Sequence, residues 1–493
     1  MQNGTQDNSR GVRRPPIVVV MGHVDHGKTT LLDHIRKASV AAREAGGITQ
    51  AVGAYEIVHH DRKITFIDTP GHEAFSAMRS RGAQAADLAI LVVAADEGVK
   101  PQTKEAIKIL EETKTPFIVA INKIDKTGGS VEKAKNDLMT ANVFLEGYGG
   151  SVSYQGISAK TGDGVDALLD LVLLASDVEE LFYDPALPAS GYILEARRGS
   201  QRGLEASVIV RNGTLRRGDL IRTPSANGKV KVLEDFLGKP VESLEPSAPA
   251  VVAGFETLPA VGEEFTIGGS ESQQKTVGGP EKKKVWKIGG GGMNGKELNL
   301  ILKASDGGSL EALSVVLEQI GAKDEKGILV LDEGVGDVTD SDVRNALANN
   351  ATIIGFKNRT EKGAQNLAEA QGVAIITSKI VYELADAVSE FLAGKRNPPA
   401  AGKLEVLAVF NQEKLEKQLV GGRVTEGVLR GKTSFDIVRL AENGAPEPIS
   451  SGRILSLREK KSELTQAEKG KEIGVLASSN TKINVGDVLV VKK

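Results

Sequence analysis

The first part of the chain alternates between short apolar runs and helical stretches. Four apolar runs lie at residues 17–21, 64–67, 88–93 and 116–121. A helical pattern at residues 103–113 follows the third run, and another at residues 131–138 follows the fourth. This alternation over residues 15–185 predicts a parallel sheet covered by helices on both faces. Ligands of such sheets bind at the carboxyl ends of the strands, where each apolar run here is followed by a polar loop.

The pattern changes after residue 185. Residues 186–267 contain short β-rich segments separated by turns such as Asn212-Gly213 and Asn227-Gly228, which predict a small antiparallel barrel. Residues 268–297 are rich in glycine and predict a linker without a core. Residues 298–378 alternate between strand and helix patterns and predict a small α/β module.

The last quarter of the chain predicts one helix and another barrel. Within residues 379–396, the apolar residues Val381, Leu384, Val388 and Phe391 form one helical stripe, which predicts a long connecting helix. Residues 397–493 are β-rich and predict a second barrel. Residues 1–14 are polar and basic and predict a disordered leader.

Composition narrows the class of protein only slightly. A chain of 493 residues predicts three or four domains. The net charge of −3 gives no sign of a nucleic-acid binder, although one basic face remains compatible with it. The absence of cysteine excludes disulfides and thiolate metal sites, and fits a reducing compartment. Because no apolar run approaches 18 residues, we expect a cytoplasmic protein without a membrane span.

A phosphate-binding loop follows the first apolar run. Residues 22–29 match the pattern G-x-x-x-x-G-K-[ST] between a strand and a helix, the context that this motif requires. Its backbone N–H groups and Lys28 would bind phosphates, and the Thr29 hydroxyl would bind Mg²⁺. The predicted nucleotide-binding residues of this loop are Gly22, His23, Val24, Asp25, His26, Gly27, Lys28, Thr29 and Thr30.

Three further loops follow later apolar runs. Asp68 could support Mg²⁺, and Gly71 could donate its N–H to a γ-phosphate. Asn122, Lys123 and Asp125 form a guanine-binding motif, because a carboxylate accepts from the paired donors of guanine and adenine lacks that pair. The residues predicted to close over the base are Ser158, Ala159 and Lys160.

One glycine-rich loop is a candidate sensor of the γ-phosphate. It spans residues 44–50 and contains Thr49, which could reach Mg²⁺ when the third phosphate is present.

At these motifs the sequence resembles the translational GTPases, and more narrowly bacterial translation initiation factor 2. Residues 22–29, 44–50 and 68–75 carry the resemblance, together with the order of the modules. It implies a multidomain α/β and β protein with a P-loop GTPase domain, a β-barrel, a small α/β/α module, a long connecting helix and a second β-barrel. The resemblance starts near Arg14, so the extended N-terminal region of many family members is absent from this sequence.

The family resemblance implies a function. With GTP bound, the protein would position formylmethionyl initiator tRNA on the small ribosomal subunit, promote joining of the large subunit and hydrolyse GTP when stimulated by the ribosome. It would need GTP/GDP and Mg²⁺, would act as a monomer and would meet other initiation factors. Thr29, Thr49 and Asp68 would serve the metal.

The same resemblance assigns catalytic roles. His72 would position the attacking water, and Val24 and Ile48 would form the apolar gate that keeps His72 away beforehand. Asp25 would balance charge near the oxygen between the β- and γ-phosphates.

The last barrel would hold the aminoacylated end of the tRNA. Its predicted contacts are Gly422, Arg458, Lys460, Glu472 and Gly474. The sequence departs from the family here, because Gly422 and Ile473 stand where cysteine is common.

Alternatives remain open at the level of sequence. Another tRNA-carrying translational GTPase would share most of these motifs, and a guanine-nucleotide-regulated ribosome-binding scaffold would share the nucleotide site. His72 directly after Gly71 favours a GTP-hydrolysing factor over the scaffold, and the motif from Asn122 to Asp125 disfavours a P-loop kinase or ATPase.

Overall fold

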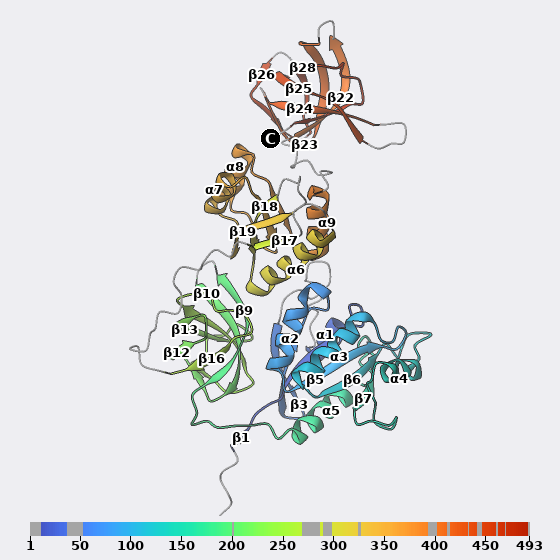
Figure 1. The fold of residues 1–493 in the computed structure, drawn as a ribbon, viewed down its shortest axis with the longest axis vertical. Coiled ribbons are helices and arrows are strands. Elements are labelled where there is room, and N and C mark those ends of the chain that lie inside the picture. Colours follow the sequence, from blue (N-terminus) through green and yellow to red (C-terminus); the bar gives the residue numbers. More distant parts are fainter. Residues whose placement is uncertain are drawn as a thin grey trace, which may run out of the picture.

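The protein is built from four bodies in chain order (Figure 1). The computed structural model describes residues 11–36, 53–199, 202–268, 286–288, 298–323, 327–392, 402–411, 415–431, 433–440, 446–459, 462–468 and 470–491. The first α/β domain and the first barrel lie side by side, the α/β module lies above them, and the second barrel lies at the far end (Figure 1).

The first domain contains a six-stranded sheet in the order β3-β4-β2-β5-β6-β7. Its strands are β2 (Ile17–Gly22), β3 (Gly53–His59), β4 (Arg62–Asp68), β5 (Leu88–Ala94), β6 (Phe117–Asn122) and β7 (Tyr154–Gly156). All neighbours are parallel except β3 and β4, which form an antiparallel hairpin. The four apolar runs are confirmed as strands, and β2 and β5 are buried along their whole length.

Helices cover both faces of this sheet, as the sequence predicts. They are α1 (Lys28–Arg36), α2 (Ser76–Ala85), α3 (Pro101–Thr113), α4 (Val131–Thr140) and α5 (Val165–Val178), with a short 3-10 helix η3 (Glu73–Phe75) before α2. One apolar core packs α3 and α4 on one face, and a second core packs α1 and α5 on the other. The carboxyl ends of β2, β4, β5 and β6 therefore meet at one open edge.

The end of the predicted leader is part of the fold. Val12 and Arg13 form β1, which pairs with β8 (Phe182–Tyr183). Arg14 is bound to the buried Asp87 at 2.5 Å. The prediction of a disordered leader is therefore wrong for residues 11–14, which belong to the fold. Residues 1–10 lie outside the described residues.

The first barrel is closed in the order β10-β15-β13-β12-β16-β9. Its strands are β9 (Ser190–Gly199), β10 (Gly203–Asn212), β12 (Leu220–Arg222), β13 (Asn227–Asp235), β15 (Pro249–Phe255) and β16 (Glu264–Ile267), and β11 (Leu215–Arg216) pairs with β14 (Ser243–Leu244). The predicted turn at Asn212-Gly213 is confirmed by the left-handed φ of +65° at Gly213. The turn predicted at Asn227-Gly228 is wrong, because both residues open strand β13.

The α/β module is a five-stranded sheet in the order β17-β19-β18-β20-β21. Its elements are β17 (Trp286–Ile288), β18 (Leu298–Ala304), α6 (Gly307–Lys323), β19 (Ile328–Val335), α7 (Asp340–Ala348), β20 (Thr352–Phe356), α8 (Lys362–Gln371), β21 (Ile375–Ser378) and α9 (Val381–Leu392). The linker prediction is wrong at residues 286–288, because β17 pairs antiparallel with β19 as an edge strand.

The apolar stripe of α9 is buried, but it does not cross open space. Val381, Leu384 and Val388 of the predicted stripe belong to the same core as α6 and β18. Phe391 is partly buried and packs against this core, and Leu392, which the stripe did not include, lies within it. The described helix therefore belongs to the module rather than standing apart as a connector. Residues 393–396 of the predicted helix lie outside the described residues.

In the described residues between 402 and 491, the second barrel contains eight strands. They are β22 (Gly402–Asn411), β23 (Gln418–Arg430), β24 (Ser434–Leu440), β25 (Pro446–Glu459), β26 (Ser462–Leu464), β27 (Gln466–Glu468), β28 (Glu472–Ser479) and β29 (Val488–Val491). Every pairing among them is antiparallel, and one apolar core fills the interior.

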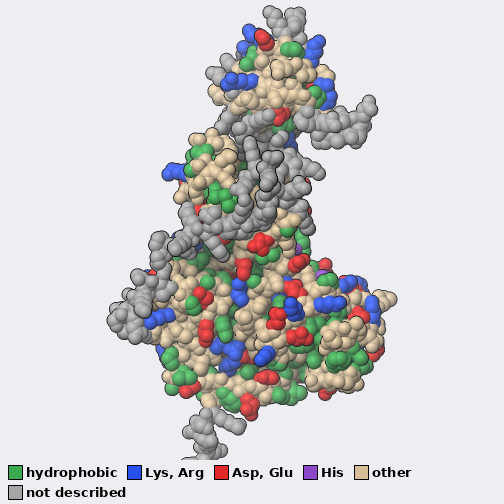
Figure 2. Space-filling model, in the orientation of Figure 1, with side chains coloured by type: hydrophobic (Ala, Val, Ile, Leu, Met, Phe, Trp, Pro, Cys, Tyr) green, Lys and Arg blue, Asp and Glu red, His purple; other side chains and the backbone are tan. Residues whose placement is uncertain are grey.

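Figure 2 shows acidic and basic side chains interspersed over the first domain. Among the described residues, every helix is too short or too polar to cross a membrane.

Candidate nucleotide-binding site

The loop between β2 and α1 adopts a conformation that suits a phosphate ligand. Gly22, Asp25 and Gly27 have φ values of +143°, +61° and +89°. Such left-handed positions turn successive N–H groups towards one concave side, which is how backbone nests bind anions. The N-terminus of α1 follows directly and adds the positive end of its dipole.

Lys28 is a buried cation beside this loop. Its side chain is buried, and desolvation lowers its pKa to about 8, with nearby Asp68 opposing the shift. Its Nζ donates to the His23 carbonyl at 2.7 Å. Burying a cation is unfavourable without a counter-charge, so the environment fits a phosphate group that would take over this contact.

Gly71 lies so close to the end of the Lys28 side chain that an added Cβ would force Lys28 or the loop to shift. A Cβ on Gly71 would lie 2.5 Å from Lys28 Nζ and 3.2 Å from Val24 Cγ2. The loop after β4 and the phosphate loop therefore face each other, and the predicted gate residue Val24 lies at their contact. The other predicted gate residue, Ile48, lies outside the described residues.

Asn122 connects three loops at the end of β6. Its Nδ2 donates to the His26 carbonyl at 2.8 Å, and its Oδ1 accepts from Ala159 N at 2.9 Å. A Cβ on Gly27 would lie 2.3 Å from Asn122 Nδ2. The buried Asn122 side chain thus links the phosphate loop to residues 158–160, a structural role that the guanine-binding motif alone did not predict.

The other residues predicted to bind the base lie on the loop after β6 and in residues 158–160. Ser158 is fully buried and its Oγ accepts from Thr161 N at 3.2 Å, while Asp125 and Lys160 are exposed. Lys123 has a left-handed φ of +67°, and its Nζ lies 3.5 Å from Glu97. The exposed Asp125 carboxylate is therefore accessible to a base at this edge.

His26 does not present its ring to the predicted ligand. The ring is fully buried beneath the loop, and its Nδ1 accepts from Ala94 N at 3.3 Å. Desolvation lowers its pKa to about 4. Its side chain therefore supports the loop against β5, and only its backbone remains available to a phosphate. The ring of His23 packs edge-on against it at 5.1 Å.

The predicted metal residues lie on adjoining elements. Thr29 is in the first turn of α1, and Asp68 ends β4 opposite Val20 of β2. A hydroxyl and a carboxylate are oxygen donors that suit Mg²⁺. Thr49 lies outside the described residues, as does the rest of loop 44–50, and Thr30 is exposed beside Thr29.

His72 follows Gly71 and starts η3. Its Nδ1 accepts from Ala74 N at 2.9 Å, and desolvation lowers its pKa. Its ring packs edge-on against Tyr382 of α9 at 4.2 Å between centroids. The predicted catalytic histidine is thus held at the boundary with the α/β module.

Two side chains that the sequence analysis did not single out support these loops: the half-buried Gln102 and the buried Arg79. The Val24 N–H donates to Gln102 Oε1 at 2.9 Å. Arg79 is almost fully buried and donates to the carbonyls of Pro70 at 3.0 Å and His72 at 2.6 Å. Neither residue belongs to a recognisable motif, because each acts on backbone atoms brought near by the fold.

The segment after Gly71 is also part of the module's core. Ala74, Phe75 and Met78 are buried in one cluster with residues of α6, β18 and α9. Arg81 of α2 forms an ion pair with Glu311 of α6 at 2.5 Å. A movement of the Gly71 loop would therefore act directly on the α/β module.

The structure brings most of the predicted tRNA contacts together. Strand β28 lies between β23 and β25, which places Gly422 opposite Ile473 and Arg458 opposite Gly474. Arg423 forms an ion pair with Glu472 at 2.6 Å. A Cβ on Gly422 would lie 2.5 Å from Leu404 Cδ2, so its side-chain space is filled. Lys460 lies outside the described residues.

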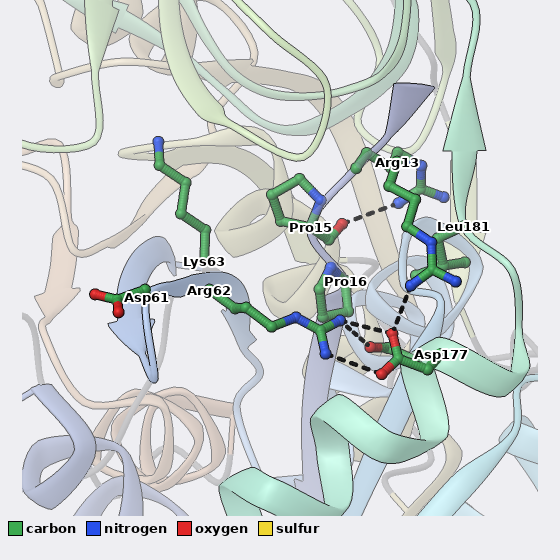
Figure 3. Close-up of a pocket in the computed structure, with 10 residues that line it drawn as sticks. Arg13, Pro15, Pro16, Asp61, Arg62, Lys63, Asp177 and Leu181 are labelled. Atoms are coloured by element: carbon green, nitrogen blue, oxygen red, sulfur yellow. Dashed lines mark hydrogen bonds and ion pairs between the residues drawn. The ribbon is translucent and has the colours of Figure 1, made fainter. Parts of the chain in front are cut away.

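A separate cavity of about 310 Å³ lies between the chain start, the β3–β4 hairpin and the end of α5 (Figure 3). Within its lining, Asp177 accepts from both Arg62 and Arg13. Because this cavity is on the amino-end side of β4, it is distinct from the nucleotide edge.

The phosphate loop, the Gly71 loop and the Asn122 loop at one edge of a parallel sheet define a P-loop GTPase domain. Family models support this class: the elongation factor Tu GTP-binding domain matches residues 13–176, elongation factor G domain 2 matches residues 188–268, and translation-initiation factor 2 matches residues 281–389.

Relatives match along nearly the whole chain. It is 39% identical over 97% of its length to "Translation initiation factor IF-2" of Anoxybacillus flavithermus and covers 68% of that protein. It is 40% identical over 98% of its length to the protein of the same name from Anaeromyxobacter sp. and covers 51% of it. The chain belongs to the bacterial translation initiation factor 2 family.

The chain covers only part of the length of some relatives. The chain covers 52% of the "Translation initiation factor IF-2" of Brucella canis, at 41% identity, so it spans about half the length of two of these relatives. A crystal structure of GDP-bound aIF5B from Aeropyrum pernix aligns over 97% of this chain and 92% of that chain, with 26% identity and a TM-score of 0.45.

Proposed function

We propose that the chain is a GTP-hydrolysing translation initiation factor. With GTP bound, it positions formylmethionyl initiator tRNA on the small ribosomal subunit and promotes joining of the large subunit. Hydrolysis, stimulated by the ribosome, then releases it. It acts as a monomer in the cytoplasm and meets other initiation factors there.

The observation that carries this proposal is the contact between two loops. Gly71 closes against the buried Lys28, so the loop after β4 lies where a γ-phosphate would separate the two. The same segment enters the core of the α/β module through Phe75 and Met78. The presence or absence of the γ-phosphate would therefore change the contact between the nucleotide-binding domain and the α/β module.

The nucleotide is held by groups with separate tasks. Lys28 and the backbone of residues 22–29 bind the phosphates, and Asp125 accepts from guanine. The Asn122 side chain keeps residues 158–160 against the phosphate loop, because it accepts from Ala159 N at 2.9 Å and donates to the His26 carbonyl at 2.8 Å. Thr29, Asp68 and Thr49 would hold Mg²⁺, which neutralises phosphate charge when it is bound.

Hydrolysis requires a positioned water and little else from the protein. Water attacks the γ-phosphorus, the bond to the β-phosphate oxygen breaks, and GDP and phosphate leave. His72 orients this water after the His72 ring has left Tyr382. Val24 and Ile48 restrict the approach of His72 to the γ-phosphate. Asp25, in its left-handed turn, lies beside the same phosphates.

The second barrel is the proposed tRNA site. Arg458, Glu472 and Gly474 lie at neighbouring positions on one face of β25 and β28, which supports one contact surface. Gly422 pairs with the buried Ile473 and therefore faces the barrel core. Lys460 belongs to the same predicted set. Because Leu404 fills the space beside Gly422, this chain would contact the formylmethionyl group at the surface formed by these strands.

The test combines turnover with tRNA protection. Purified chain is assayed for GTP hydrolysis with and without ribosomes, and for protection of formylmethionyl-tRNA from deacylation. We expect ribosome-dependent hydrolysis that His72→Ala removes while GDP binding is retained. Protection of another aminoacyl-tRNA instead would indicate a different tRNA-carrying GTPase, and binding without turnover would indicate a scaffold.

A further inference from the structure

The β3–β4 hairpin ends in two adjacent histidines. His59 is the last residue of β3, and His60 and Asp61 form the two-residue turn before Arg62. Both turn residues have left-handed φ values, +47° and +62°, as in a type I′ turn. The two imidazole rings lie 4.2 Å apart between centroids.

Both rings face one carboxylate of α5. Nε2 of His59 lies 2.8 Å from Asp170 Oδ1, and Nε2 of His60 lies 3.2 Å from the same oxygen. All three donor atoms lie within 4.8 Å of one another. Around a tetrahedral Zn²⁺ with bonds of about 2.0–2.2 Å, neighbouring donors are about 3.3 Å apart, so these distances are close to those of a metal site.

The hairpin and the helix are fixed to each other independently of the histidines. Asp177, two turns after Asp170 on α5, pairs with Arg62 at 2.8 Å and with Arg13 at 3.0 Å (Figure 3). Helix α5 is itself anchored in an apolar core through residues such as Leu169 and Val172. The donor set is therefore held in place before any ion arrives, and the charge of Arg62 is already balanced.

The donor chemistry suits a zinc-class ion. Two imidazoles and one carboxylate form a three-ligand set that leaves a fourth position for water. The side chain of His59 is 11% exposed, whereas those of His60 and Asp170 are 71% and 56% exposed, so solvent reaches the open position.

We propose that His59, His60 and Asp170 form a surface site for a zinc-class divalent cation. This site is distinct from the Mg²⁺ position at the nucleotide, because it adjoins Arg62, at the opposite end of β4 from Asp68. Seven strand residues separate these ends by roughly 20 Å. A bound ion would fasten β3, the edge strand of the sheet, to α5.

The chain offers a clean background for the test. It has no cysteine and six histidines, so thiolate sites do not compete. Tag-free full-length chain, stripped of metal and saturated with GDP and Mg²⁺, is titrated with ZnCl₂ by calorimetry. Co²⁺ serves as a second probe, because its visible absorption reports tetrahedral coordination. The variants are His60→Ala and Asp170→Asn, and the control is His34→Ala, an exposed histidine of α1.

We expect one Zn²⁺ per chain in the wild type and in His34→Ala, undiminished by excess Mg²⁺. His60→Ala and Asp170→Asn should each weaken binding at least tenfold and remove the tetrahedral Co²⁺ spectrum, while GDP affinity stays unchanged. Absence of stoichiometric Zn²⁺ binding in the wild type would overturn the proposal. Equal binding by the two variants, or equal loss in the His34 control, would also overturn it.

Discussion

The ring of His72 packs edge-on against the ring of Tyr382, with 4.2 Å between their centroids. His72 directly follows Gly71 in the nucleotide-binding domain, whereas Tyr382 lies in the first turn of α9 in the α/β module. Figure 1 shows this module above α2. The module therefore holds the imidazole that the proposed reaction needs, so a change at either side affects the other.

Tyr382→Ala should release this histidine. An aromatic pair of this geometry contributes about 0.5–1.5 kcal/mol, so its loss should raise ribosome-independent GTP hydrolysis roughly 2- to 10-fold. Single-turnover hydrolysis of radiolabelled GTP measures the change. Tyr382→Phe keeps the ring and should behave as wild type. A rate in Tyr382→Ala equal to that of Tyr382→Phe would show that the contact does not restrain His72.

Gly71→Ala tests the approach of the two loops. The added Cβ would lie 2.5 Å from Lys28 Nζ, so either the loop or the lysine must shift. We expect affinity for a non-hydrolysable GTP analogue to fall at least tenfold, with GDP affinity less affected. Equilibrium titration with a fluorescent nucleotide measures both. Gly53→Ala is the control, because its Cβ would meet nothing within 4 Å.

Asn122→Ala and Asp125→Asn distinguish a residue that supports two loops from a residue that recognises guanine. Asn122 is buried and holds two loops, so its loss should reduce the free energy of unfolding by about 1–3 kcal/mol and weaken all nucleotides. Asp125 is exposed, so Asp125→Asn should leave stability unchanged and shift preference from guanine towards xanthine. Thermal unfolding and competition between GDP and XDP give the two readouts. Retained guanine preference in Asp125→Asn would exclude this carboxylate as the base contact.

Glu195 should make the junction between the first barrel and the module sensitive to pH. Burial, together with Asp306, raises its pKa to about 8, and its Oε1 accepts from Gly308 N at 3.1 Å. The folded chain keeps this proton to about pH 8, whereas an unfolded glutamate releases it near its ordinary value of 4.5. The stabilising contribution is therefore complete below pH 4.5 and is lost as the pH rises towards 8, by roughly 3–5 kcal/mol at most.

Glu195→Gln should remove this dependence, because the amide stays neutral. The measurement is the difference in thermal unfolding midpoint between variant and wild type across this pH range. The difference should grow in favour of the variant as the pH rises. Glu256→Gln, an exposed glutamate of the same barrel, is the control and should follow the wild type. A constant difference across the range would show that Glu195 does not titrate there.

The sequence predicted which loops meet at this edge of the sheet, because the signals for them are local. Residues 22–29 carry their own turn chemistry, and Asp68 and Asn122 each end a buried apolar strand. Carboxyl ends of parallel strands meet at one edge, so placing the strands was enough to bring these residues together.

What escaped prediction depends on contacts made by the whole fold. Tyr382 meets His72 only because α9 packs into the core of the module beside η3. Strand β17 is a three-residue edge strand held by backbone pairing, which leaves little mark on a glycine-rich sequence. The ring of His26 resembled a ligand in its motif, yet it faces β5, a direction that residue spacing in a turn does not specify.

The most direct test of the central claim is GTP hydrolysis during assembly of an initiation complex. Small subunits, messenger RNA and formylmethionyl-tRNA are mixed with this chain and GTP, large subunits are added, and phosphate release is followed with light scattering from subunit joining. The account predicts rapid joining and a burst of phosphate, with the burst lost and joining retained in His72→Ala. Phosphate release unaffected by ribosomes, or joining as slow with the chain as without it, would contradict the account.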